Sequence, residues 1–162
     1  MKKLFWGLLL VSPWTLQAQK ATIKIDPERV IGDIDPRIYG VFMEPIHFNG
    51  KRLGLPDSVE FNTLYGTLYD PASPLADENG FRKDYIDAMK DLKVTNMRWP
   101  GGNFLMGYNW EDGIGPKEKR PVRINMAWGG LENNHVGTDE WFKLNKSMNS
   151  ENIVCVNLGL GT

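Results

Sequence analysis

Three apolar, strand-like segments alternate with two helix-like segments along this chain, and this order constrains the fold more than any other feature. Strands are predicted at 38–43, 94–98 and 153–158, and the last is continuously apolar, as in strands buried on both faces of a parallel sheet. The alternation predicts β/α units and therefore an α/β fold with a parallel sheet. Three parallel strands leave the edges of a sheet uncovered, so the pattern is that of an unfinished fold.

The two helices are predicted from their apolar stripes. The first covers 81–93, where apolar residues share one face and charged residues cover the rest. The second covers 138–148, where Thr138 is the predicted N-cap and acidic residues fill the first turn.

Two long loops, 48–80 and 103–137, separate these elements. Loops of that length inside a compact domain are usually functional or disordered. Leu64 and Leu68, with Tyr65 and Tyr69, predict that the first loop is packed against the fold. The second loop carries Trp and Asn side chains suited to carbohydrate, although a solvated loop with Trp anchors would have the same composition.

Length, charge and cysteine content exclude several classes of protein. The chain has 162 residues, whereas a complete (β/α)8 barrel needs at least about 200. Lys and Arg number 19 against 20 Asp and Glu, which argues against a nucleic-acid partner. The single cysteine, Cys155, excludes a disulfide framework, and its apolar surroundings predict a buried, inert thiol. His47 and His135 are far apart in the sequence, with no Cys or second His near either, so no metal site is predicted.

The first eighteen residues have the pattern of an export signal. Two lysines precede an apolar run over 4–11, and Pro13 and Ala18 follow it. The run is shorter than the roughly 20 apolar residues that a membrane span needs. We expect cleavage after Ala18 and export to a periplasm or outside the cell, with a buried N-terminal helix as the alternative. Residues 21–25 then alternate as a half-buried strand does.

Glu44 follows the first predicted strand, at the end of a parallel sheet where ligands bind. Because Pro45 follows it, Glu44 is expected in extended backbone. Its carboxylate could accept a hydrogen bond from a ligand hydroxyl. A surface or helix-capping glutamate is the alternative.

The segment after the second predicted strand, 98–103, is richer in candidate ligand-binding groups. Asn103 can donate and accept hydrogen bonds, which suits a sugar hydroxyl, and Trp99 offers a flat apolar face. The two glycines between them allow a sharp turn close to a ligand. Arg98 could hold a neighbouring carboxylate ionised through a bidentate pair. A structural turn around a buried Trp is the alternative.

Long co-linear blocks of this sequence resemble the opening of the α-L-arabinofuranosidases of glycoside hydrolase family 51. The blocks cover nearly all of 30–162 and lie at 38–40 with Glu44, 80–84, 98–104, 110–116, 119–121, 127–130, 137–140 and 156–159. That family combines a (β/α)8 barrel with a β-sandwich that takes in the first strands of the chain.

The resemblance implies three regions in this chain. Residues 1–18 would be a signal peptide, 19–37 a strand segment that joins the sandwich, and 38–162 the N-terminal part of the barrel, with about three β/α units. Removal of the leader would leave 144 residues, a length that fits about three of the eight β/α units of such a barrel.

The resemblance also implies an activity, the retaining, exo-acting release of terminal α-L-arabinofuranosyl groups from arabinan or arabinoxylan without a cofactor. Retention uses two glutamates about 5–5.5 Å apart. In this family they lie on strands four and seven, beyond Thr162. Glu111, Glu132 and Glu140 are therefore not nominated as catalytic, and the isolated segment is predicted to be inactive and poorly folded.

The resemblance assigns substrate binding to Glu44, Asn103 and Trp128, and to Arg98 the support of the catalytic carboxylates. Many members have His directly after the glutamate, whereas Pro45 and Ile46 intervene here before His47. Arabinose-containing plant polysaccharides or oligosaccharides are the expected partners. Neither a nucleic-acid partner nor a membrane span is expected, and the full-length protein could be a homo-oligomer. A family member active on β-glucan and a non-catalytic carbohydrate-binding barrel remnant are the alternatives.

Overall fold

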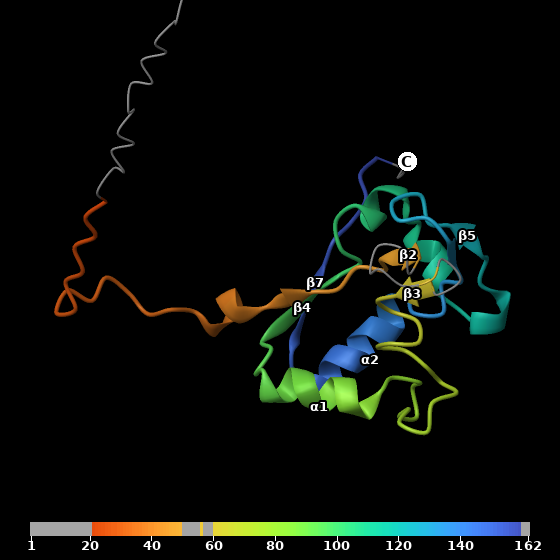
Figure 1. Cartoon of the computed structure of the whole chain (residues 1–162), viewed down its shortest axis with the longest axis horizontal. Helices are drawn as coiled ribbons and strands as arrows, with labels where there is room; N and C mark the ends of the chain where they lie inside the picture. The colour runs from red at the N-terminus through yellow and green to blue at the C-terminus, as the bar shows by residue number, and fades with distance from the viewer. Residues whose placement is uncertain (1–20, 50–55, 57–59, 160–162) are drawn as a thin grey trace, which may run out of the picture. The chain divides into compact units, whose positions relative to one another are not determined.

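The computed structural model of the chain describes residues 21–49, 56 and 60–159 (Figure 1). It divides into two units, Met1–Asp33 and Ile34–Thr162, which are treated separately below. The leader predicted over 1–18 lies outside the described residues.

The strand predicted over 21–25 is not formed. The described residues of the first unit are all exposed and form only a turn, in which the Arg29 amide donates to the Asp26 carbonyl at 3.3 Å. A strand is stabilised by hydrogen bonds to a neighbouring strand, and no described segment pairs with this one. Its apolar face is accordingly uncovered, with Ile23 83% exposed.

The second unit contains a parallel sheet of three strands, in the order β1-β4-β7. The strands are β1 (Val41–Phe42), β4 (Asn96–Trp99) and β7 (Glu151–Val154). Both pairings are parallel, which confirms the predicted α/β class. β1 is shorter than predicted because a 3-10 helix, Pro36–Tyr39, takes up the start of the segment.

Two helices pack beside the sheet. They are α1 (Lys83–Asp91) and α2 (Thr138–Met148), and α2 contacts β4, β7 and α1 (Figure 1). α2 has the predicted bounds, but its N-cap is Gly137 and not Thr138. The Glu140 carboxylate reaches back to accept the Gly137 N–H at 2.9 Å, so a glutamate at the third helical position caps this end.

The long loops contain short elements that the sequence did not predict. Two antiparallel pairs form there, β2 (His47–Asn49) with β3 (Glu60–Asn62), and β5 (Arg123–Ile124) with β6 (Leu131–Glu132). Three 3-10 helices cover Phe104–Gly107, Trp110–Gly113 and Lys117–Lys119.

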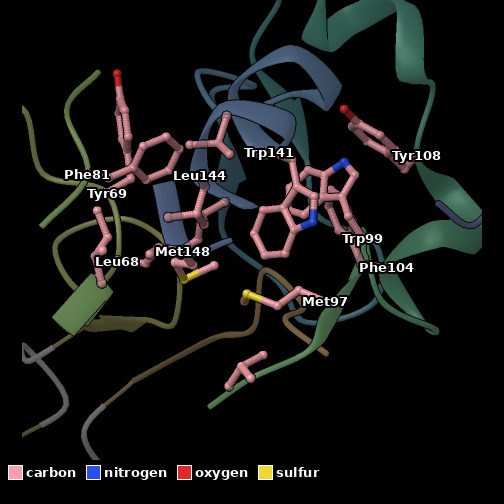
Figure 2. Close-up of a cluster of buried hydrophobic side chains, with 14 residues drawn as sticks. Leu68, Tyr69, Phe81, Met97, Trp99, Phe104, Tyr108, Trp141, Leu144 and Met148 are labelled. Carbon is pink, nitrogen blue, oxygen red and sulfur yellow. The ribbon is translucent and has the colours of Figure 1, made fainter. Parts of the chain in front are cut away.

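One hydrophobic core joins the sheet, the helices and the first long loop (Figure 2). Trp99 of β4 stacks on Trp141 of α2, with ring centroids 4.8 Å apart. Leu64 and Leu68 are fully buried in the same cluster, which confirms that the described part of this loop around them is packed.

β7 is not buried on both faces as predicted. All four of its residues are exposed, with Ile153 and Val154 each 44% accessible, and Cys155 is only half-buried. The reason is that β7 pairs with β4 alone among the described strands, so its second edge and part of its surface lack cover. No helix among the described residues is long and apolar enough to cross a membrane.

Candidate substrate-binding site

Glu44 lies just beyond the carboxyl end of β1 and is 8% exposed. Its Oε1 accepts a short hydrogen bond from the backbone N–H of Phe104. No described group donates to the other carboxylate oxygen, so this oxygen is left available to a ligand. The side chain therefore has a fixed direction and one unused acceptor.

Gly101 allows Glu44 to lie this close to the segment after β4. A Cβ at Gly101 would fall 2.5 Å from the Glu44 Cβ, and the residue has φ +105°. Both the contact and the left-handed backbone favour glycine. The Pro-Gly-Gly sequence after β4 is thus what lets the ends of two strands meet at one carboxylate.

Asn103 lies next to this carboxylate, because it directly precedes Phe104. It occupies the N-cap position of the 3-10 helix Phe104–Gly107, but its side chain makes no capping hydrogen bond. Asn103 is exposed, and its amide has no partner among the described residues. The structure therefore brings two of the predicted binding residues together.

Arg98 does not form the predicted carboxylate pair within the described part of the chain. Its guanidinium carbon lies 4.9 Å from the centre of the Phe42 ring, and its Nε is buried without a hydrogen-bond partner among the described residues. Along β4 the side chains alternate, so Arg98 faces Phe42 while Trp99 faces the core. Trp99 is 1% exposed, so it is the buried Trp of the structural alternative and offers no face to a sugar.

Trp128 is half-buried against the hydrophobic core, and its indole Nε1 is buried without a described partner. It belongs to a turn held by Asn125, whose Oδ1 accepts the Trp128 N–H at 3.0 Å. The Nδ2 of Asn125 donates to the Pro45 carbonyl at 2.8 Å. Trp128 is thereby tied to the segment that carries Glu44.

Sequence reasoning missed Asn125 and also Thr63, which holds the same segment from the other side. The Thr63 hydroxyl donates to the Glu44 carbonyl and accepts the Ile46 N–H at 2.9 Å. An Asn shortly before Gly129 and Gly130 is a turn signal, which marks the turn but not its distant partner.

Glu111, Glu132 and Glu140, which were not nominated as catalytic, lie in environments that differ from that of Glu44. Glu140 forms a buried ion pair with Arg120, with oxygen–nitrogen distances of 2.9 and 3.0 Å. Burial alone would raise the pKa of Glu140, but the hydrogen bonds from Arg120 lower it. Burial raises the pKa of Glu132, although the Tyr65 hydroxyl and backbone N–H groups bind its carboxylate. Glu111 is exposed.

The two histidines lie in different surroundings. The His47 ring packs on Gly130, where a Cβ would fall 1.9 Å from its Nδ1. Burial, with Lys117 and Arg120 nearby, lowers the pKa of His135. No group of three or more His, Cys, Asp or Glu side chains that could hold a metal occurs in the described ranges.

A cavity of about 610 Å³ opens beyond the ends of β4 and β7. Trp110 and Glu111 border it from the second loop, Val154 from the end of β7, and Cys155 from the residue that follows β7. None of the four predicted site residues lines it. Trp99, Pro100 and Leu105 also line the cavity, so it borders the same segment after β4 on a side that Glu44 does not line.

Known proteins match this chain over most of its length. The family model described as the alpha-L-arabinofuranosidase 1 domain matches residues 88–162. Alpha-L-arabinofuranosidase C of Emericella nidulans is 45% identical over 140 residues, covering 86% of this chain and 25% of that protein. The intracellular exo-alpha-(1->5)-L-arabinofuranosidase 1 of Bacillus subtilis is 45% identical over 141 residues, covering 87% and 25%.

Solved structures match in the same way. The arabinose complex of the Thermotoga maritima α-L-arabinofuranosidase superposes with a TM-score of 0.70 at 44% identity, covering 85% of this chain and 26% of that one. The thermostable family 51 enzyme of Thermotoga petrophila gives the same four values. The chain thus spans about a quarter of the length of these relatives.

The prediction of export is wrong. The Bacillus subtilis relative, 45% identical to this chain, is an intracellular enzyme by name. The prediction depended on only a short apolar run after two lysines, followed by Pro13 and Ala18.

The co-linear match in sequence and fold, at 44–45% identity over more than four-fifths of the chain, shows that this chain belongs to the α-L-arabinofuranosidases of glycoside hydrolase family 51.

Proposed function

We propose that this chain supplies part of the arabinofuranose-binding site of an exo-acting, retaining α-L-arabinofuranosidase. Glu44 and Asn103 hydrogen-bond the sugar, Trp128 borders its cleft, and Arg98 supports the catalytic carboxylates. Residues 38–162 form about three β/α units of a (β/α)8 barrel, and 19–37 contribute to a β-sandwich.

The observation that carries the proposal is the Glu44 carboxylate. One oxygen is held by the Phe104 N–H, and the other has no described donor. The exposed Asn103 amide lies one residue from Phe104 and offers both a donor and an acceptor. An oriented acceptor beside an amide suits the hydroxyl groups of a furanose ring.

The names of the relatives support a substrate for this proposal. The Thermotoga maritima structure is an arabinose complex, and the Bacillus subtilis relative is an exo-α-(1→5)-L-arabinofuranosidase by name. We therefore propose terminal α-L-arabinofuranosyl groups of arabinan or arabinoxylan as the substrate. The catalytic pair is supplied by segments outside this sequence.

A chimera tests the proposal. Residues Ile34–Thr162 replace the aligned segment of the thermostable Thermotoga petrophila enzyme, which is 44% identical to this chain. We expect the folded chimera to hydrolyse p-nitrophenyl α-L-arabinofuranoside and linear arabinan. A folded chimera that cleaves neither, or that prefers a β-glucan oligosaccharide, would contradict the proposal, and turnover by the 162-residue chain alone would contradict the placement of the catalytic pair.

Replacing Asn103 with alanine in the chimera should cost about 1–3 kcal/mol of transition-state binding, because sugar hydroxyls lose their partner. The measurement is kcat/KM on p-nitrophenyl α-L-arabinofuranoside. Asn109→Ala is the matched control, since Asn109 is also an N-cap but uses its side chain to accept the Glu111 N–H. Equal kcat/KM for Asn103→Ala and the parent chimera would remove Asn103 from the site.

Replacing Gly101 with alanine should displace Glu44, because the new Cβ would overlap its side chain. We expect kcat/KM of the chimera to fall about 10-fold, as small misplacements of a binding group do. Gly66→Ala is the control, because Gly66 has φ +78° but open space where a Cβ would lie. If both variants keep the same kcat/KM, the contact between Gly101 and Glu44 does not matter for binding.

A further inference from the structure

Asn125 contacts two segments that the proposed site needs. It is 4% exposed and lies just after β5. Its Nδ2 donates to the Pro45 carbonyl at 2.8 Å, and its Oδ1 accepts the N–H groups of Ala127 and Trp128 at 3.1 and 3.0 Å. One amide therefore joins the residue after Glu44 to the turn that carries Trp128.

The main chain around Asn125 makes this turn stiff. The Asn125 N–H donates to the Gly130 carbonyl at 3.0 Å, and the Asn125 carbonyl accepts the Gly129 N–H at 2.8 Å. The side chain of an Asn that binds N–H groups two and three residues on is a common way to fix a turn. The position of Trp128 thus follows that of Asn125.

The Glu44 side of the contact is also constrained. Pro45 is buried and has no N–H, so its carbonyl is its one polar backbone group, and a buried carbonyl needs a donor. Asn125 supplies that donor, while Thr63 holds the flanking Glu44 carbonyl and Ile46 N–H. The short segment after Glu44 is therefore fixed from two different loops.

We propose that Asn125 is a positioning residue that sets the separation between Glu44 and the Trp128 turn. The proposal rests on the proposed function, because it assumes that both residues meet the sugar. An amide suits this role, since it donates from one end and accepts at the other. Neither a carboxylate nor a side chain shorter than Asn can keep both contacts.

The test uses Asn125→Asp in the chimera. This change keeps the acceptor for the Trp128 turn but replaces the donor to Pro45 with a second acceptor. We expect kcat/KM to fall about 10-fold through the displaced Glu44. The deficit should shrink as the pH falls, because a protonated carboxyl group can again donate to the Pro45 carbonyl.

Asn145→Asp is the matched control. Asn145 is fully buried in α2, donates through Nδ2 to the Trp141 carbonyl and Asn152, and accepts the Ser150 hydroxyl through Oδ1. The substitution again removes donors and keeps an acceptor, but far from Glu44 along the chain. We expect lower thermal stability with kcat/KM equal to that of the parent.

A double-mutant cycle separates positioning from a general structural role. If Asn125 acts through Glu44, Asn125→Asp should cost much less in a Glu44→Gln background than in the parent chimera. Where Asn125→Asp does not fold, Asn125→Ser decides, because its hydroxyl can still accept from the turn but is too short to reach Pro45. The inference would be overturned if the effects of Asn125→Asp and Glu44→Gln on kcat/KM were additive, or if Asn125→Asp kept the same kcat/KM as the Asn145→Asp control. An active parent chimera would still support the proposed function in that case.

Discussion

Replacing Arg120 with alanine should lower the free energy of local unfolding of α2 by about 3–5 kcal/mol, because the substitution leaves the buried Glu140 carboxylate without its partner. The side chains of Arg120 and Glu140 are 3% and 6% exposed. Arg120 also donates to the carbonyls of Gly115, Asn134 and His135, so the change leaves several acceptors of the second long loop unpaired. Hydrogen exchange of the α2 amides in the chimera measures the loss.

The same ion pair predicts a pH dependence. Arg120 lowers the pKa of Glu140 in the folded state below the ordinary glutamate value of 4.5, against the opposing effect of burial. The stabilisation from the ion pair is therefore complete above the unfolded pKa and is lost as the pH falls through the lowered folded pKa. The difference between the parent and Arg120→Ala should shrink over that acidic range.

Arg123→Ala is the control for Arg120. Arg123 pairs with Asp112 at 2.8 Å, but its side chain is 61% exposed. Exposed pairs of this kind contribute only about 0–1 kcal/mol. An Arg120 variant that is no less stable than the Arg123 variant would show that the buried pair does not hold the second loop to α2.

Replacing Glu44 with glutamine should lower kcat/KM of the chimera about 100-fold, the scale for losing a charged hydrogen-bond partner of the substrate. The amide oxygen of glutamine can still accept the Phe104 N–H, so the fold of the strand end should be kept. What changes is the second position, where an NH2 group replaces the acceptor oxygen. Inhibition by L-arabinose should weaken in parallel.

Glu118→Gln is the control for the loss of charge. Glu118 lies exposed on the 3-10 helix Lys117–Lys119, and its replacement changes the net charge by the same amount. We expect kcat/KM equal to that of the parent. A Glu44 variant that behaves like the Glu118 variant would remove Glu44 from the substrate-binding site.

Secondary-structure elements that depend on interactions between residues close in the sequence were predictable from the sequence. α2 has the predicted bounds, because an apolar stripe, an acidic first turn and the left-handed Asn149 at its end all act within a few residues. The capping residue was wrong by one position, because the Glu140 side chain supplies the cap that Thr138 was expected to provide.

Strands, which depend on hydrogen bonds to a neighbouring strand, were predicted only in part. β7 begins at Glu151, two residues before the predicted strand, and the Glu151 N–H donates to the Thr95 carbonyl at 2.9 Å. The alternating segment 21–25 has a strand pattern but no partner, and it stays irregular. Hydrophobic pattern marks a segment that can pair, whereas the neighbouring strand decides where pairing starts and stops.

The residues of the candidate site also fall into those that were predictable from the sequence and those that were not. The sequence singled out Glu44, Arg98 and Asn103, because each lies at or just beyond a predicted strand end. It did not identify Asn125, whose bond to Pro45 joins residues 80 positions apart. A turn-forming Asn is visible locally, but its second hydrogen bond depends on which loops the fold brings together.

The sequence by itself determined the α/β class and the family resemblance, because alternating apolar segments and long co-linear blocks are properties of the chain alone. It also predicted where the substrate-binding residues lie. The tertiary structure decided which side chains are available there. Successive side chains on β4 point to opposite faces of the sheet, so Trp99 is buried on Trp141 while Arg98 stacks on Phe42. Burial and partner choice depend on what each face packs against, and that is fixed only when distant segments meet.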